Sequence, residues 1–235
     1  MFVIAHRGAS AAAPESTEAA IRLAFRMRAD LVELDVQLTA DHRLVIFHDE
    51  RVERTTNGHG WLRHRRYAEL ARLDAGAWFA PRFAGQRVLL LSRVLRMTAP
   101  HRLNLELKRT TQPLRLIESL VRCVRRARAT TRVLLSSFDA SLLARVRAAQ
   151  PTMARALLCR RQPWQAMAQA VRLGCVALHP HISLITPALV AKAHAAGLRL
   201  HTWTVDDPLQ ALRLARWGVD GLFTNTPDRI RKALG

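Results

Sequence analysis

Short apolar runs recur along the chain, and segments rich in alanine, leucine and arginine separate most of them. The runs have the length of strands, and the segments between them carry apolar residues at helical spacing. The runs cover residues 2–5, 31–36, 103–107, 132–138, 154–159, 175–180, 198–205 and 220–225. Because eight strands alternate with helices within 235 residues, the pattern predicts a (β/α)8 TIM barrel. An open, doubly wound sheet is the alternative, but the glycine-rich sequence that usually follows its first strand is absent.

One interval, residues 37–102, is longer than a simple crossover needs. Its first part, "QLTADHRLVIFHDE", predicts a hairpin that turns at Asp41 and His42, and the remainder is typical of loops. We therefore expect one domain over residues 1–235, with a small insertion after the second strand at about residues 50–98. In this fold such an insertion is expected over the C-terminal face of the barrel, where the chemistry of the fold takes place.

Acidic residues interrupt two strands that should be apolar throughout. A barrel strand is buried on both faces, yet Glu33 and Asp35 alternate in "LVELDV" and so point the same way. Glu106 shares a face with Asn104 and Lys108 in "LNLELK". Three poorly solvated carboxylates with no cysteine nearby are typical of a site for Mg²⁺ or Ca²⁺. The alternative is that these acids pair with arginines of the barrel.

Two histidines stand at strand ends that lead to the same face. His6 ends the first strand, within "AHRG", and His48 ends the apolar run "LVIFHDE". Two imidazoles beside a carboxylate-bound cation, with Arg7 and Lys108 alongside, form a coherent phosphoryl-transfer site: acid, base, Lewis acid and donors for phosphate oxygens. The other histidines lack such company and are interpreted as surface, turn or packing residues.

The charge and the cysteine content indicate which binding partners and which cellular compartment to expect for this protein. The net charge of +19 comes almost wholly from arginine, but the arginines are spread along helical segments, which indicates a compositional bias and solvated helix faces rather than a nucleic-acid-binding stripe. The three cysteines have no metal-binding spacing and are expected to be reduced thiols. No run has the length of a signal peptide core or a membrane span, so we expect a cytoplasmic protein without stable membrane insertion.

Several stretches resemble successive signatures of the glycerophosphodiester phosphodiesterase family. They are "AHRGAS…APEST", "ADLVELDVQLTADHRLVIFHDERVERTTNGHG", "LNLELK", "LHTWTVDD" and "GVDGLFTNTPD", in the family's order and over nearly the whole chain. The resemblance implies a (β/α)8 barrel, a divalent cation, and hydrolysis of small glycerophosphodiesters to glycerol 3-phosphate and an alcohol. It leaves open which histidine is the acid, and whether water or a glycerol hydroxyl attacks first.

The family's functional positions are carried over residue by residue. The resemblance makes His6 and His48 catalytic, Glu33, Asp35 and Glu106 metal ligands, and Arg7, Lys108, Trp203 and Glu15 substrate-site residues. Two departures put the rate and the substrate preference in doubt: Ser16 stands where the family usually has asparagine, and the apolar "LLLS" of residues 89–92 replaces a more polar stretch.

Two rivals to this activity remain. One is a related barrel that cleaves lysophospholipids, which a long apolar channel near the insertion would favour; the aromatic residues of the insertion, Trp61, Trp78, Phe79 and Phe83, could line it. The other is a basic protein that binds anions or nucleic acid and has lost its active site, but no expected ligand or histidine is missing here.

Overall fold

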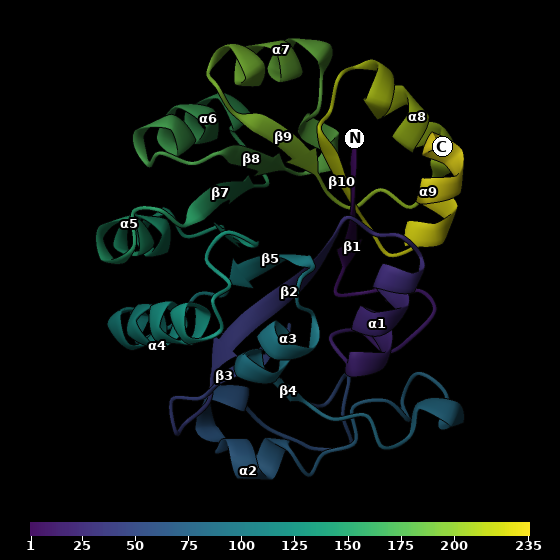
Figure 1. The fold of residues 1–235 in the computed structure, drawn as a ribbon, viewed down its shortest axis with the longest axis vertical. Helices are drawn as coiled ribbons and strands as arrows, with labels where there is room; N and C mark the ends of the chain where they lie inside the picture. The colour runs from purple at the N-terminus through teal and green to yellow at the C-terminus, as the bar shows by residue number, and fades with distance from the viewer.

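A computed structural model describes all residues, 1–235, and shows a closed barrel of parallel strands (Figure 1). The barrel strands are β1 (Phe2–His6), β2 (Leu31–Leu38), β5 (Arg102–Leu107), β6 (Val133–Ser137), β7 (Ala154–Cys159), β8 (Ala177–Pro180), β9 (Arg199–Thr202) and β10 (Gly221–Thr224). Each pairs in parallel with the next, and β1 closes the ring by pairing with both β2 and β10. The predicted TIM barrel is confirmed, and the open sheet is excluded by this closure.

Helices surround the barrel, and most of them lie in the segments that the sequence pattern marked as helical. The helix over residues 91–97 is an exception, because it lies in the part of the insertion that was expected to form loops. The helices are α1 (Glu18–Arg26), α3 (Leu91–Met97), α4 (Pro113–Arg126), α5 (Ala140–Ala149), α6 (Pro163–Arg172), α7 (Pro187–Ala195), α8 (Pro208–Arg216) and α9 (Pro227–Leu234). Proline stands in the first turn of α4 and of α6 to α9, where the missing N–H costs no hydrogen bond. Side-chain caps at Thr17, Asp139, Thr186 and Asp207 fix where four of the helices begin.

The insertion after β2 begins as the predicted hairpin. Strand β3 (Leu44–Ile46) pairs antiparallel with β2, and β4 (Leu89–Leu90) pairs antiparallel with β3. Between β3 and β4 lie the short helix α2 (Tyr67–Leu70) and two 3₁₀ turns, η1 (Leu62–His64) and η2 (Pro81–Phe83). This segment has a small apolar core of its own, made by Val45, Phe47, Val52, Leu62, Leu70, Ala75 and Val88.

Two of the histidines that we interpreted from the sequence as surface, turn or packing residues lie inside the barrel. His179 on β8 and His201 on β9 are both buried, and their ring nitrogens Nε2 and Nδ1 are 3.1 Å apart. The second nitrogen of each ring has no hydrogen-bond partner. Burial lowers the pKa of both rings, that of His201 to about 4, so both are neutral in the folded protein at neutral pH.

Two further expectations concern the thiols and the membrane. All three cysteines are free, as predicted. No helix of this structure has the length and apolarity that crossing a membrane requires.

Candidate functional site

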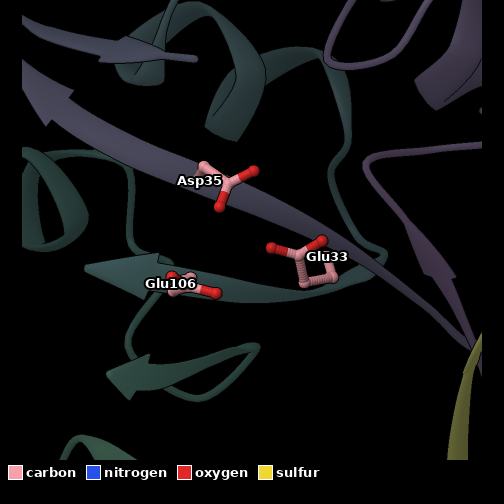
Figure 2. A group of neighbouring side chains, drawn as sticks. All are labelled: Glu33, Asp35 and Glu106. Atoms are coloured by element: carbon pink, nitrogen blue, oxygen red, sulfur yellow. The ribbon is translucent and has the colours of Figure 1, made fainter. Parts of the chain in front are cut away.

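Three carboxylates converge where β2 and β5 run side by side. Asp35 pairs directly with Glu106 across the two strands, and Glu33 lies two residues earlier on the same face of β2. Figure 2 shows the three side chains turned toward one another. Each offers an oxygen within 4.8 Å of the others, and Glu33 and Asp35 are almost completely buried. The strand pairing therefore gathers the three predicted metal ligands in one place.

Two basic residues border this carboxylate cluster. Lys108 Nζ lies 2.9 Å from Asp35 Oδ1 and 2.8 Å from Glu106 Oε1. The backbone N–H of Arg7 donates to Glu33 Oε2 over 3.0 Å, and Arg7 Nε lies 3.5 Å from Asp35 Oδ2 without forming a hydrogen bond. The alternative of pairing with basic residues thus holds in part, because Lys108 and Arg7 satisfy some of the carboxylate oxygens and not others.

The carboxylates strongly affect one another. Burial, with the charges of Asp35 and Glu106, raises the pKa of Glu33 well above its ordinary range. Burial and Asp35 also raise the pKa of Glu106. Burial opposes the ionisation of Asp35 as well, but the charges of Lys108, His48 and Arg7 keep its pKa below the ordinary value. Carrying three negative charges here is unfavourable unless a further cation is bound.

A divalent cation fits this set of donors. Glu33 Oε1 and Asp35 Oδ2 are buried and accept no hydrogen bond, which is unusual for charged oxygens in a folded protein. Both belong to a cluster made only of oxygen donors, the preference of Mg²⁺ and Ca²⁺ rather than of softer metals. The residues present can therefore hold such an ion.

His6 lies beside this cluster, and its ring is oriented by the amide of the residue that follows the last strand. Its Nδ1 is 2.8 Å from Asn225 Oδ1, and its Nε2 is 4.0 Å from Glu33 Oε2. Asn225 is itself held by Asp206, whose Oδ2 accepts from Asn225 Nδ2 over 2.7 Å and whose Oδ1 accepts from the Asn225 backbone N–H, also over 2.7 Å. Because a carboxylate only accepts, the amide nitrogen must face Asp206 and the amide oxygen must face His6. His6 therefore carries its proton on Nδ1 and presents the Nε2 lone pair toward the carboxylates.

His48 has a charged partner instead of an amide. Its Nδ1 lies 2.6 Å from Asp49 Oδ1, and Asp49 Oδ2 accepts from Arg54 Nε over 2.5 Å. Burial lowers the pKa of His48, whereas the carboxylates of Asp35 and Asp49 favour its protonated form. Burial also lowers the pKa of His6, and Arg7 adds to that effect. The two rings thus have different environments, one bonded to a neutral amide and the other to a carboxylate.

Gln37 holds the backbone that carries His48. It occupies the same face of β2 as Glu33 and Asp35, two residues further along. Its Nε2 lies within 2.8, 3.1 and 2.8 Å of the carbonyl oxygens of Phe47, His48 and Asp49. One face of a single strand therefore bears two of the three carboxylates and the group that fixes the loop of His48.

Glu15 connects the surroundings of the two histidines. Its carboxylate accepts from Arg7 Nη1 over 3.0 Å and from both Nη atoms of Arg54, over 2.9 and 2.7 Å. Arg54 also binds Asp49, the partner of His48. The neighbouring Ser16 has a φ of 61°, a conformation that asparagine adopts more readily than serine, and its buried Oγ has no partner.

A cavity of about 860 Å³ opens beside the cluster at the C-terminal ends of the strands. His48, Glu106 and Lys108 line it, together with Phe138 and Arg160. Trp203 packs edge-on against Phe138, with 5.6 Å between the ring centroids. Three of the predicted residues thus line this cavity, and Trp203 borders it through its contact with Phe138.

Sequence reasoning missed four polar residues that orient the predicted ones: Gln37, Asp49, Asp206 and Asn225. All four stand at or just after the C-terminal ends of strands, inside the stretches that carried the family resemblance. A polar residue at such a position can be recognised in the sequence as a candidate site residue. The residue that it contacts cannot be recognised there, because Asp206 and Asn225 come close to His6 only when the barrel closes.

Comparisons with known proteins point to one family. Residues 6–229 match the profile of the "Glycerophosphoryl diester phosphodiesterase family". A glycerophosphodiester phosphodiesterase of Caldanaerobacter subterraneus subsp. tengcongensis is 37% identical over 236 residues, covering 97% of this chain and 96% of its own length. One from Bacillus subtilis is 32% identical over 251 residues, covering 99% and 86%. Among solved structures, a phosphodiesterase of Oleispira antarctica in complex with its product sn-glycerol-3-phosphate superimposes with a TM-score of 0.96 at 33% identity, covering 100% of this chain and 96% of that one.

Proposed function

Since the chain belongs to the glycerophosphodiester phosphodiesterase family and is a phosphodiesterase of that class, we propose that it hydrolyses small glycerophosphodiesters to glycerol 3-phosphate and an alcohol. The observation that carries this proposal is the buried carboxylate cluster with two unpartnered oxygens, beside a histidine whose lone pair faces it. The Oleispira relative was solved with sn-glycerol-3-phosphate as its product, which supports the same product here.

Glu33, Asp35 and Glu106 are proposed to hold Mg²⁺ or Ca²⁺. Such an ion, when bound, polarises a phosphoryl oxygen and offsets the negative charge that builds up during the reaction. Arg7 and Lys108 border the carboxylates and can donate to the remaining phosphoryl oxygens.

The different partners of the two histidines suggest different roles. His6 presents a bare Nε2, so we assign it as the base that takes a proton from the attacking hydroxyl, of water or of the glycerol itself. His48 donates from Nδ1 to the Asp49 carboxylate, which stabilises an imidazolium. We therefore assign it as the acid that protonates the leaving alkoxide.

The structure offers little support for lysophospholipid cleavage. The only apolar residues that line the cavity beside the cluster are Leu107, Phe138 and Ala140. Phe79 packs against both Trp78 and Phe83, with 5.6 Å between ring centroids in each pair. These three aromatic residues pack against one another within the insertion, and none of them lines the cavity, so a small polar substrate is the better match.

The test is an assay of the purified protein with Mg²⁺ or Ca²⁺ and glycerophosphocholine, glycerophosphoethanolamine or glycerophosphoglycerol. We expect release of glycerol 3-phosphate, and we expect His6→Ala and His48→Ala each to lower kcat by about 10²-fold or more, the scale of positioned acid–base catalysis. His194→Ala is the matched control, because His194 is a surface histidine paired with Asp220. Release of a phosphorylated alcohol, or activity on acylated lysolipids alone, would favour the lysophospholipid reaction. If no diester is hydrolysed, the result would favour the basic anion-binding protein that has lost its active site.

A further inference from the structure

An aromatic corner stands at the mouth of the cavity. Phe138 follows β6 and Trp203 follows β9, and their rings meet at 87°. Trp203 Nε1 donates to the carbonyl oxygen of His179 over 2.9 Å, and the ring of His181 packs edge-on against Trp203 with 4.9 Å between centroids. The indole is therefore held in place, and the corner is a formed feature of the structure.

A cation of the chain itself occupies this corner. The guanidinium carbon of Arg160, just after β7, lies 5.1 Å from the centre of the Phe138 ring and 5.3 Å from that of Trp203. Both distances are within the range of a cation–π contact. Arg160 forms no ion pair, in contrast to Arg54, which binds both Glu15 and Asp49. Its N–H donors therefore stay free to bind acceptor oxygens in the cavity.

Perpendicular aromatic faces are the surroundings that a quaternary ammonium group prefers, and an exposed cation beside them repels such a group. The acidic and basic residues that line the cavity are equal in number: Glu50, Glu106 and Asp139 against Lys108, Arg109 and Arg160. Asp139 accepts hydrogen bonds from the backbone N–H and the hydroxyl of Ser141. Discrimination between alcohols therefore depends on the place of Arg160 rather than on the net charge of the mouth.

We propose that Arg160 determines head-group specificity: by filling the Phe138–Trp203 corner, it disfavours diesters of cationic alcohols and favours diesters of neutral, oxygen-rich alcohols. The inference rests on the proposed function, and it places the alcohol part of the substrate at this corner. A neutral polyol offers acceptor oxygens to the guanidinium, whereas a trimethylammonium group must displace it.

The experiment compares two substrates that share the glycerol phosphate part, glycerophosphoglycerol and glycerophosphocholine. The wild-type protein is expected to have the higher kcat/KM for glycerophosphoglycerol. Arg160→Gln should raise the ratio of kcat/KM for glycerophosphocholine to that for glycerophosphoglycerol by about tenfold, the scale of a cation–π contact together with relief of repulsion. Arg161→Gln, the matched control, removes the same charge at the adjacent exposed position and should leave the ratio unchanged.

A second variant tests the aromatic part of the proposal. Adding Phe138→Leu to Arg160→Gln removes one wall of the corner and should cancel most of the gain for glycerophosphocholine. An unchanged ratio in Arg160→Gln, an equal loss for both substrates, or a gain that survives Phe138→Leu would overturn the role of Arg160 while leaving the proposed function intact. Failure of the wild-type protein to release glycerol 3-phosphate from either substrate would overturn the proposed function itself, and this inference with it.

Discussion

Asn225 Oδ1 lies 2.8 Å from Nδ1 of His6, although 219 positions separate the two residues in the chain. The contact joins the end of the first strand to the segment that follows the last strand. These two strands, β1 and β10, pair with each other in parallel. Asp206 leaves the amide of Asn225 a single orientation and so decides which nitrogen of His6 carries the proton. The closure of the barrel thereby fixes the chemical form of a proposed catalytic group.

Exchanging Asp206 and Asn225 tests this arrangement. Asn225→Asp alone brings two carboxylates together where a 2.7 Å hydrogen bond now stands, and Asp206→Asn alone removes the group that fixes the amide. We expect each single variant to lower kcat by about tenfold or more with little change in KM, because His6 is misplaced. The double variant restores a complementary pair and should recover much of the loss. Nitrogen chemical shifts of the His6 ring would report its tautomer. A double variant no better than the worse single one would contradict this role.

Removing the Gln37 amide should loosen the loop of His48. Gln37→Leu leaves the carbonyl oxygens of residues 47–49 without their common donor, so kcat should fall by about tenfold while KM stays nearly constant. Steady-state kinetics well below the melting temperature, with the same metal, would measure this. Gln169→Leu is the control, since Gln169 lines the same cavity without a side-chain hydrogen bond to the loop. Equal effects of the two substitutions would show that Gln37 has no special function.

Chelation should abolish activity and lower stability together. A bound divalent ion stabilises the folded protein by RT ln(1 + [M]/Kd), or about 2.7 kcal/mol at a hundredfold excess over Kd. Thermal melts with excess chelator, and with Mg²⁺ or Ca²⁺ added back, would follow this dependence. Glu33→Gln should be inactive and should respond much less to metal. Full activity in excess chelator would show that the carboxylates serve the fold instead.

The pH dependence of the metal-free protein should reveal the raised pKa of Glu33. A carboxyl whose pKa is higher in the folded than in the unfolded state destabilises the fold as pH rises above its ordinary value of 4.5. Without metal, Glu33→Gln should therefore have a higher free energy of unfolding than the wild-type protein. This difference should be small near pH 4.5 and should grow at higher pH. Urea denaturation of both proteins across this range would measure the difference. A difference that does not depend on pH would mean that Glu33 ionises freely in the folded protein.

Acid should destabilise the barrel through His201. Its pKa falls from 6.5 to about 4 on burial, so the stability that the neutral ring contributes is complete above pH 6.5 and is lost as pH falls toward 4. The loss attributable to this group is about 3 kcal/mol at pH 4. Denaturation curves of the wild-type protein and His201→Leu would test this, and the variant should lose less stability between pH 6.5 and 4. Parallel losses would point to other groups.

The sequence by itself predicted the strands of the barrel, most of its helices and the candidate residues of the site. Apolar runs separated by helical segments were sufficient for a parallel sheet, because strands that are buried on both faces read as continuous apolar sequence. The number of runs favoured the closed barrel over an open sheet. The same rule exposed the site, since Glu33, Asp35 and Glu106 violate it and therefore need a reason to be buried. The hairpin at Asp41 and His42 followed from alternation and turn residues alone.

The tertiary structure decided everything that depends on which strand ends become neighbours. The register of β2 against β5 sets Asp35 beside Glu106, and ring closure brings Asn225 to His6 and Trp203 to Phe138. These partners come from segments far apart in the chain, and no local pattern encodes their distance. The different surroundings of the two histidines, and the cation in the aromatic corner, therefore emerge only in three dimensions, because hydrogen-bond direction and ring contact depend on positions to within an ångström.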